Sequence, residues 1–236
     1  SAVPAYALGL ALLVAVALFG DVAKGARRWL DLGVTRIQPS ELMKIAMPLM
    51  LAWYFQRREG ARGWVDFVVA GLLLAVPVGL IARQPDLGTA LLVSSAGLYV
   101  IFLGGLSWKV IAGGIVAGLA SLPVLWSVMH DYQRQRILMM IDPSSDPLGK
   151  GFHVIQSTIA VGSGGIWGKG WMEGTQTHLE FIPERTTDFI FAVFSEEFGL
   201  IGNATLLAIY LLVIGRGLVI AANGATLFAR LLAGAI

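Results

Sequence analysis

Ionisable side chains in this sequence gather in three short clusters, and each cluster borders a long apolar stretch. They lie at residues 24–44, 83–88 and 178–188. Charged groups are costly beside hydrocarbon, so such clusters are candidate functional sites. Arginine and lysine suit a phosphate-bearing ligand, and carboxylates suit the removal of a proton from a hydroxyl group. The sequence therefore predicts polar sites at the ends of apolar segments.

The first cluster contains Arg28 and Trp29, followed by Gln38, Glu41 and Lys44. Glu41 and Lys44 are three positions apart, which places them on the same face of a helix. One interpretation is a capped helix with an ion pair in its first turn. We favour an acidic and basic pair at the mouth of a cavity, because Lys44 lies inside an apolar run.

The second cluster lies where two apolar stretches meet. Arg83 and Asp86 bracket a short break at Gln84 and Pro85, which is typical of a turn between two helices. Asp86 then has two interpretations that the sequence does not separate. It either caps the helix that follows or contacts a ligand at the helix end.

The third cluster holds the carboxylates of Glu180, Glu184 and Asp188, and Asp188 directly precedes an apolar stretch. Asp188 either caps the following helix or acts as a general base, and the two roles are compatible. Glu196 and Glu197 lie two turns deeper in the same stretch. We expect them to hold structure rather than to contact a substrate.

The composition predicts an integral membrane protein. Of the 236 residues, 14% are charged and 56% are hydrophobic, and the mean hydropathy is +0.75. Soluble proteins carry about 25% charged residues. The net charge of +2 does not indicate a nucleic-acid partner. Because the chain has no cysteine, disulfides, thiolate metal sites and cysteine nucleophiles are excluded.

The apolar residues predict an all-α, polytopic transmembrane bundle. Their segments approach the length of a membrane span and lack the alternation of barrel strands, and only helices satisfy the backbone of such segments in hydrocarbon. The small-residue spacing of Gly113, Gly114 and Gly118 predicts close helix packing. The segments lie at residues 3–20, 42–55, 65–82, 88–106, 110–129, 189–215 and 217–236.

The connection at residues 130–188 is too long for an ordinary loop and holds several aromatic residues, so we expect an ordered cap on the bundle. Residues 151–161 predict a short amphipathic helix, and the glycines at 162–165 and 168–170 predict flexible elbows. Counting lysine and arginine in the short loops gives five on each side of the membrane, so the positive-inside rule does not assign the orientation.

Other chemistries lack their motifs. The three histidines have no metal-ligand spacing, and no glycine-rich nucleotide loop follows a strand. Ser163 is flanked by glycines but lacks the strand–turn–helix context of a hydrolase nucleophile. No dedicated metal site is predicted.

Several longer motifs resemble the shape, elongation, division and sporulation (SEDS) family. The resemblance covers nearly the whole chain, in the same order. It implies ten transmembrane helices, of which this chain would hold the third to the start of the ninth, as a fragment forming a single domain at 1–236. Thr186 departs from the histidine usual in the family. The motifs are GARRWLDLG (25–33), QPSELMKIA (38–46), QPDLGTA (84–90), QSTIAVGSGGIWGKGW (156–171) and HLEFIPERTTDFIFAV (178–193).

The resemblance implies a peptidoglycan glycosyltransferase of the bacterial cytoplasmic (inner) membrane, which polymerises lipid II into glycan strands. It implies a class B penicillin-binding protein and membrane proteins of the elongation machinery as partners, and places the 130–188 loop outside the cytoplasm. Two further motifs, HDYQRQRI (130–137) and DPLGKGFH (146–153), are closer to the elongation branch than to the septal branch. No cofactor is implied with certainty, although Mg²⁺ or Mn²⁺ would suit a diphosphate leaving group.

The resemblance also assigns residues. The essential acid of the family matches Asp188, as the catalytic general base. The substrate-cavity residues match Arg28, Trp29, Gln38, Glu41, Lys44, Asp86, Lys169, Glu180 and Glu184.

Two other functions fit the same polar clusters. A flippase that transports lipid-linked cell-wall precursors would use the Glu41 and Lys44 pair for passage rather than for chemistry. A membrane scaffold would depend on its lipid-facing spans and not on residues 178–188.

Overall fold

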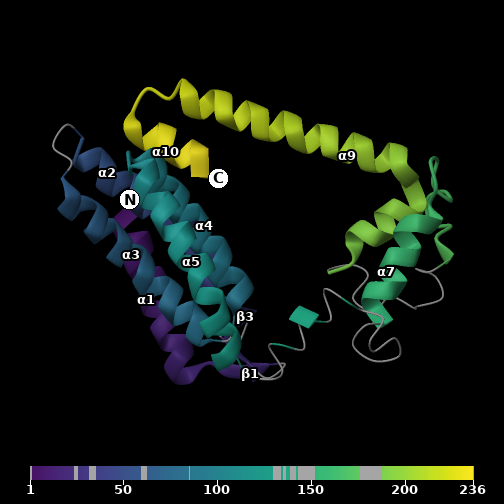
Figure 1. Cartoon of the computed structure of the whole chain (residues 1–236), viewed down its shortest axis with the longest axis horizontal. Coiled ribbons are helices and arrows are strands. Elements are labelled where there is room, and N and C mark those ends of the chain that lie inside the picture. Colours follow the sequence, from purple (N-terminus) through teal and green to yellow (C-terminus); the bar gives the residue numbers. More distant parts are fainter. Residues whose placement is uncertain are drawn as a thin grey trace. The chain divides into compact units, whose positions relative to one another are not determined.

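The computed structural model describes residues 2–23, 26–31, 36–59, 63–84, 86–129, 134, 137–138, 142, 152–175 and 188–235. The expected helical membrane architecture is confirmed (Figure 1). In the described part of the chain, four helices are long and apolar enough to cross a membrane: α1 (Ala2–Phe19), α3 (Trp64–Arg83), α5 (Trp108–Val128) and α9 (Ile190–Ala222).

The chain divides into two compact units, which are described separately. The first contains residues 1–115 and 215–236, and the second contains residues 116–214. The expectation of a single transmembrane domain over 1–236 stays a prediction.

The first unit is a helical bundle built around α2 (Pro39–Arg57). This helix packs against α1, α4 (Leu87–Leu103) and α10 (Leu227–Ala235), and α3 packs against α4 (Figure 1). Burial of apolar side chains between the helices supplies the main packing energy. The fully buried side chains of this core include Leu13, Met43, Met47, Leu51, Phe55, Ile81 and Val100.

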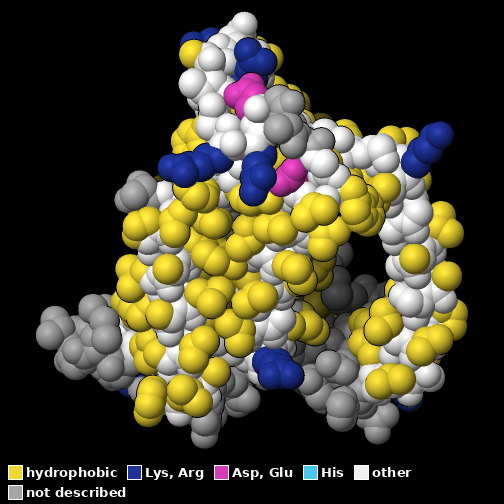
Figure 2. Space-filling view, turned by 90° about the vertical axis from the view of Figure 1, so that its left-hand side faces the viewer, with side chains coloured by type: hydrophobic (Ala, Val, Ile, Leu, Met, Phe, Trp, Pro, Cys, Tyr) yellow, Lys and Arg dark blue, Asp and Glu magenta, His cyan; other side chains and the backbone are white. Residues whose placement is uncertain are grey.

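The outer surface of the helices is also apolar. Figure 2 shows hydrophobic side chains over the middle of the molecule, with charged side chains above and below them. Leu91, Leu92 and Leu98 of α4 are large apolar side chains that are exposed. Large exposed apolar surfaces are rare on soluble monomers, so this surface is suited to lipid.

A buried carboxylate ties the end of α2 to the start of α3. Asp66 accepts hydrogen bonds from the Gly63 backbone N–H over 2.8 Å and from the Tyr54 hydroxyl over 2.9 Å. Arg58 Nε lies 3.6 Å from the same carboxylate. Because a buried charge is costly without partners, these contacts fix the connection between the two helices.

Between α1 and α2 lies an antiparallel sheet that the sequence analysis did not anticipate. It consists of β1 (Asp21–Ala23), β2 (Ala26–Asp31) and β3 (Arg36–Ile37), in the order β1-β2-β3. Trp29 pairs with Asp21, and Leu30 pairs with Ile37. The register shifts between Asp21 and Val22, because Val22 pairs with Arg27, so Arg28 lies at an irregularity of β2.

The second unit contains residues 116–128 of α5, α7 (Phe152–Ser163) and residues 190–214 of α9. The helix expected at 151–161 is thereby confirmed as α7. The expected division between two apolar segments at Arg216 is wrong, because α9 continues to Ala222. The interruption lies instead at Gly199, whose φ of 62° and ψ of −159° are not helical.

Candidate functional site

Two residues predicted from separate motifs meet at the start of α2. The side-chain amide of Gln38 donates to Asp86 Oδ2 over 3.0 Å and to Ser40 Oγ over 3.0 Å. Nearby, Arg28 Nε donates to the backbone carbonyl of Gln84 over a long 3.4 Å. The fold thus brings β2, the start of α2 and the α3–α4 junction together.

The α3–α4 junction is tightly tied to this end of the bundle. Asp86 Oδ1 accepts a hydrogen bond from the Thr89 backbone N–H over 3.3 Å, so Asp86 does cap α4. The buried side chain of Gln84 donates to the carbonyl of Leu13 in α1 over 3.1 Å. Asp86 can still contact a ligand, because a carboxylate has more acceptor positions than the Gln38 amide and the Thr89 N–H fill.

Glu41 and Lys44 form the ion pair that their spacing predicts, with Lys44 Nζ 2.8 Å from Glu41 Oε1. The pair is accessible, since the Glu41 side chain is 54% exposed and that of Lys44 is 35% exposed. The Trp29 side chain is also exposed. These three side chains are therefore placed to contact a ligand at the polar end of the first unit.

In the second unit, Asp188 lines a small cavity of about 280 Å³ between α7 and the start of α9. Ser157 and Thr158 of α7 contribute hydroxyl groups to the same wall. The Asp188 side chain is exposed and makes no hydrogen bond or ion pair with the residues that the structure describes, so it does not cap α9 there.

Lys169 occupies a different setting. Its Nζ lies 2.7 Å from Glu196 Oε1 and 2.7 Å from Thr175 Oγ1. Glu196 is fully buried and also accepts from Thr175 over 3.1 Å and from Ser163 Oγ over 3.4 Å. The expectation that Glu196 holds structure agrees with this network, in which it is the central acceptor.

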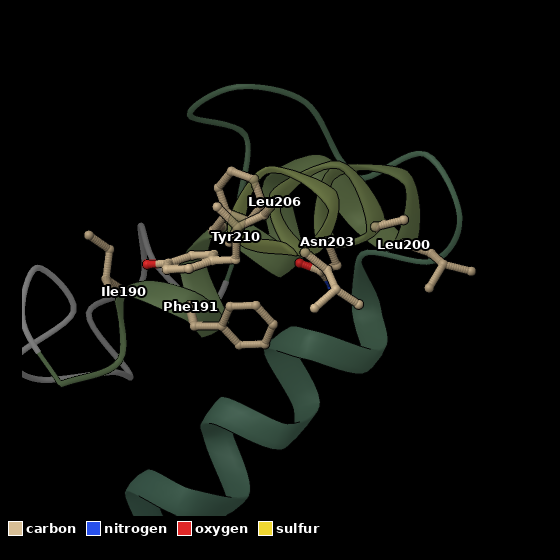
Figure 3. Close-up of a pocket in the computed structure, with 9 residues that line it drawn as sticks. Ile190, Phe191, Leu200, Asn203, Leu206 and Tyr210 are labelled. Carbon is tan, nitrogen blue, oxygen red and sulfur yellow. The ribbon is translucent and has the colours of Figure 1, made fainter. Parts of the chain in front are cut away.

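A larger apolar cavity, of about 680 Å³, lies in the bend of α9 (Figure 3). Phe191 lies before the break at Gly199, whereas Leu206 and Tyr210 lie after it. Asn203 supplies a polar group in the wall and accepts a hydrogen bond from Ser195 Oγ over 3.0 Å. A cavity of this chemistry suits an acyl or isoprenoid chain.

The remaining predicted residues divide between the units. Arg28, Trp29, Gln38, Glu41, Lys44 and Asp86 lie in the first unit, and Lys169 and Asp188 lie in the second. Glu180, Glu184 and Thr186 lie outside the described residues, so their roles stay predictions.

Sequence reasoning missed four polar side chains of these sites. Gln84 lies beside Arg28 and Thr175 accepts a hydrogen bond from Lys169. Ser157 and Thr158 line the same cavity as Asp188. Three of them lie inside the motifs quoted above, so the motifs held the signal without showing which side chains face the sites.

The described part of the chain does not form a metal site. Within the described residues, no group of three or more His, Asp or Glu side chains is placed to hold an ion. The carboxylates of Asp86 and Glu196 are already engaged with protein donors.

The fold and these sites define a polytopic helical membrane protein with polar clusters at its helix ends. All 236 residues match the cell cycle protein family of FtsW, RodA and SpoVE, and the chain belongs to this family. This confirms the membership in the SEDS family that the motifs indicate.

The curated relatives carry names of cell-wall enzymes. The chain is 55% identical over 232 residues to the peptidoglycan glycosyltransferase MrdB of Escherichia coli (strain K12), covering 98% of this chain and 63% of that protein. It is 38% identical over 231 residues to the probable peptidoglycan glycosyltransferase FtsW of Geobacter metallireducens, covering 95% of this chain and 60% of the relative. The chain thus spans less than two thirds of these relatives.

Solved structures show the same fold. A chain from a peptidoglycan synthase complex that coordinates polymerization and crosslinking is 40% identical, with a TM-score of 0.79, and the match covers 99% of this chain and 65% of that chain. The rod shape determining protein RodA of Thermus thermophilus is 30% identical, with a TM-score of 0.65, and the match covers 99% and 60%.

Proposed function

We propose that this chain is part of a peptidoglycan glycosyltransferase that polymerises lipid II during cell elongation, with Asp188 as the general base. The observation that carries the proposal is the exposed Asp188 carboxylate on the wall of a cavity that Ser157 and Thr158 also line. The names of the relatives support the reaction class. The similarity to RodA supports the role in elongation.

The reaction needs one base and one displacement. Asp188 takes the proton from a hydroxyl of the acceptor sugar as that oxygen attacks the anomeric carbon of the donor. The new glycosidic C–O bond forms while the bond to the diphosphate breaks, and the diphosphate leaves with the electron pair. An α-linked donor gives a β-linked product by this single inversion, without a covalent glycosyl-enzyme.

The leaving diphosphate needs positive charge as it departs. We assign this charge to Arg28, Lys44 or Lys169, on the strength of their motifs. Trp29, Gln38 and Asp86 belong to the same proposed set of substrate-binding residues. Glu41 holds Lys44 until the diphosphate competes for its ammonium group. Glu180 and Glu184 belong to the same proposed set of binding residues on the strength of their motif.

A divalent cation would serve the same leaving group. Mg²⁺ binds through one or two carboxylates together with substrate phosphates, so it does not require a cage made only of protein ligands. Polymerisation measured with Mg²⁺, with Mn²⁺ and with excess chelator would decide the requirement.

The proposed setting is the bacterial cytoplasmic membrane, with the 130–188 loop outside the cytoplasm. A class B penicillin-binding protein is the proposed partner that crosslinks the glycan strands. The similarity to a chain of a synthase complex that coordinates polymerization and crosslinking supports such a pairing. Membrane proteins of the elongation machinery complete the proposed set of partners.

The test is a lipid II polymerisation assay on the full-length protein with its partner in proteoliposomes. We expect glycan strands from labelled lipid II, and transport of lipid II across the bilayer in the same vesicles should be negligible. Transport without any glycan product would overturn the proposal in favour of the flippase.

A further inference from the structure

The break at Gly199 frees two backbone donors of α9, and a loop from another part of the unit accepts both. In an uninterrupted helix, each N–H donates to the carbonyl four residues earlier. Here Leu200 N–H donates instead to the carbonyl of Gly165 over 2.9 Å. Ile201 N–H donates to the carbonyl of Ile166 over 3.1 Å.

The same loop supplies donors to the two carbonyls that these N–H groups would have used. The Glu196 carbonyl accepts from the Lys169 backbone N–H over 3.0 Å. The Glu197 carbonyl accepts from the Gly170 backbone N–H over 3.0 Å. Residues 164–170, the inserted loop, thus replace both partners of both lost helical bonds, as backbone inside a membrane protein requires.

The fit between the inserted loop and α9 is close enough to require glycine. A Cβ atom on Gly164 would collide with the Ser195 carbonyl, and one on Gly168 would collide with the Glu197 carbonyl. Gly168 also has a φ of 81°, which other residues rarely adopt. Gly164 and Gly168, which the sequence analysis places in flexible elbows, therefore pack closely against the backbone of α9.

One ion pair closes this contact. Lys169 follows Gly168 in the inserted loop, and its Nζ reaches Glu196 Oε1 over 2.7 Å. The Lys169 side chain is 27% exposed and the Glu196 side chain is fully buried. The lysine ammonium group therefore neutralises a carboxylate that solvent does not reach. A buried carboxylate left without its cation is strongly unfavourable.

The contact lies on the same helix pair as the general base. Ala160 of α7 packs against Ala192 and Phe189, and these two residues follow Asp188 directly or within one turn. From Ile190 to Glu196 the helix rises roughly 9 Å. Fixing α7 against α9 at Glu196 therefore also fixes Thr158 against Asp188 in their shared cavity.

We propose that Lys169 and Glu196 are positioning residues, whose ion pair locks the inserted loop into the break of α9 and thereby sets the geometry of the Asp188 cavity. This assigns Lys169 a role different from the substrate contact that the family resemblance implies. The inference rests on the proposed function for its kinetic readout. Its structural readout does not depend on activity.

A double-mutant cycle separates the two roles of Lys169. The variants are Lys169→Met, Glu196→Gln and the double variant, with Lys169→Arg as the conservative change. Each is made in the full-length protein with its partner, and kcat and KM for lipid II are measured per folded complex. Lys109→Met, an exposed lysine at the start of α5, is the matched control.

If the pair positions the cavity, each single variant lowers kcat by about tenfold or more while KM stays within about twofold. The double variant is no worse than either single one, because both changes break the same contact. Lys169→Arg restores most of the rate. Hydrogen exchange at Leu200 and Ile201 accelerates in both single variants, and Lys109→Met changes neither quantity.

Two results would overturn the inference. A higher KM with unchanged kcat in Lys169→Met, together with normal kinetics in Glu196→Gln, would make the lysine a substrate ligand. Unchanged hydrogen exchange at the break of α9 in both single variants would show that the pair does not lock the loop. If the wild type makes no glycan, the proposed function fails, whereas the exchange measurement still tests the lock.

Discussion

Gln38 donates a hydrogen bond to Asp86 over 3.0 Å, across 48 positions of the chain. The contact joins the start of α2 to the start of α4, and Asp86 at the same time caps α4 through the Thr89 N–H. One buried carboxylate therefore holds two helix ends in place. It also belongs to the proposed binding site, so its structural and functional roles need to be separated by experiment.

We expect Asp86→Asn and Asp86→Ala to differ in stability but not in activity. Asparagine caps helices well through its single amide oxygen, and the Gln38 amide can turn so that its own oxygen accepts from the new NH2 group, so the stability should lie within about 1 kcal/mol of the wild type. Alanine loses the cap and strands Gln38, at a cost of about 1–2 kcal/mol. Both should lose polymerisation by about tenfold or more if the charge contacts substrate.

Thermal unfolding in detergent and the lipid II assay measure these two properties for each Asp86 variant. An Asp86→Asn protein with wild-type polymerisation would show that Asp86 serves only as a cap.

Asp188→Asn should remove the general base while leaving the fold intact. The carboxylate makes no contact with described residues that the amide would lose, so the unfolding temperature should not change. Polymerisation should fall by about 100-fold or more, the usual contribution of a positioned base. Glu173→Gln, at an exposed acid of the same unit, is the control and should keep its rate. Persistent glycan synthesis by Asp188→Asn would refute the mechanism.

Lys44→Met tests whether the exposed ion pair with Glu41 is a binding element. An exposed pair one helical turn apart contributes about 0.5 kcal/mol or less, so the unfolding temperature should hardly move. We expect KM for lipid II to rise by about tenfold, because a cation that meets the diphosphate is lost. Lys109→Met should leave KM unchanged. A stable Lys44→Met enzyme with normal KM would assign the pair to structure alone.

Gly162 and Gly164 offer a matched pair of substitutions two positions apart. A Cβ on Gly162 would meet open space, and alanine in the last turn of α7 should stabilise the protein by up to about 1 kcal/mol. A Cβ on Gly164 would collide with the Ser195 carbonyl, so Gly164→Ala should cost about 2 kcal/mol. Unfolding temperatures of the two variants give the comparison. Equal stability would mean that the inserted loop does not fit against α9 as described.

Most helices could be located from the sequence because long apolar segments have only one stable backbone form in hydrocarbon. The segment at 65–82 became α3 (Trp64–Arg83), and that at 110–129 became α5 (Trp108–Val128). The strands of β1–β3 were missed, because they are short and their pairing partners lie across turns rather than in a periodic pattern.

The spacing of the glycines in the sequence did not show which of them lie at a closely packed contact. Gly113, Gly114 and Gly118 have the spacing of an interface, yet a Cβ on any of them would meet open space. Gly97 lies against Leu74 instead, and Gly199 takes the backbone angles that break α9. A glycine's role depends on what approaches it, which is not encoded by its neighbours in the chain.

The sequence by itself determined the helical membrane class, the clusters of ionisable residues and, through its motifs, the family. Tertiary structure decided which of those residues meet: Gln38 with Asp86, and Lys169 with Glu196 rather than with solvent. The physical reason is range. Hydrophobicity and helix preference act over neighbouring residues, whereas a hydrogen bond or ion pair forms only where packing brings distant groups within about 3 Å.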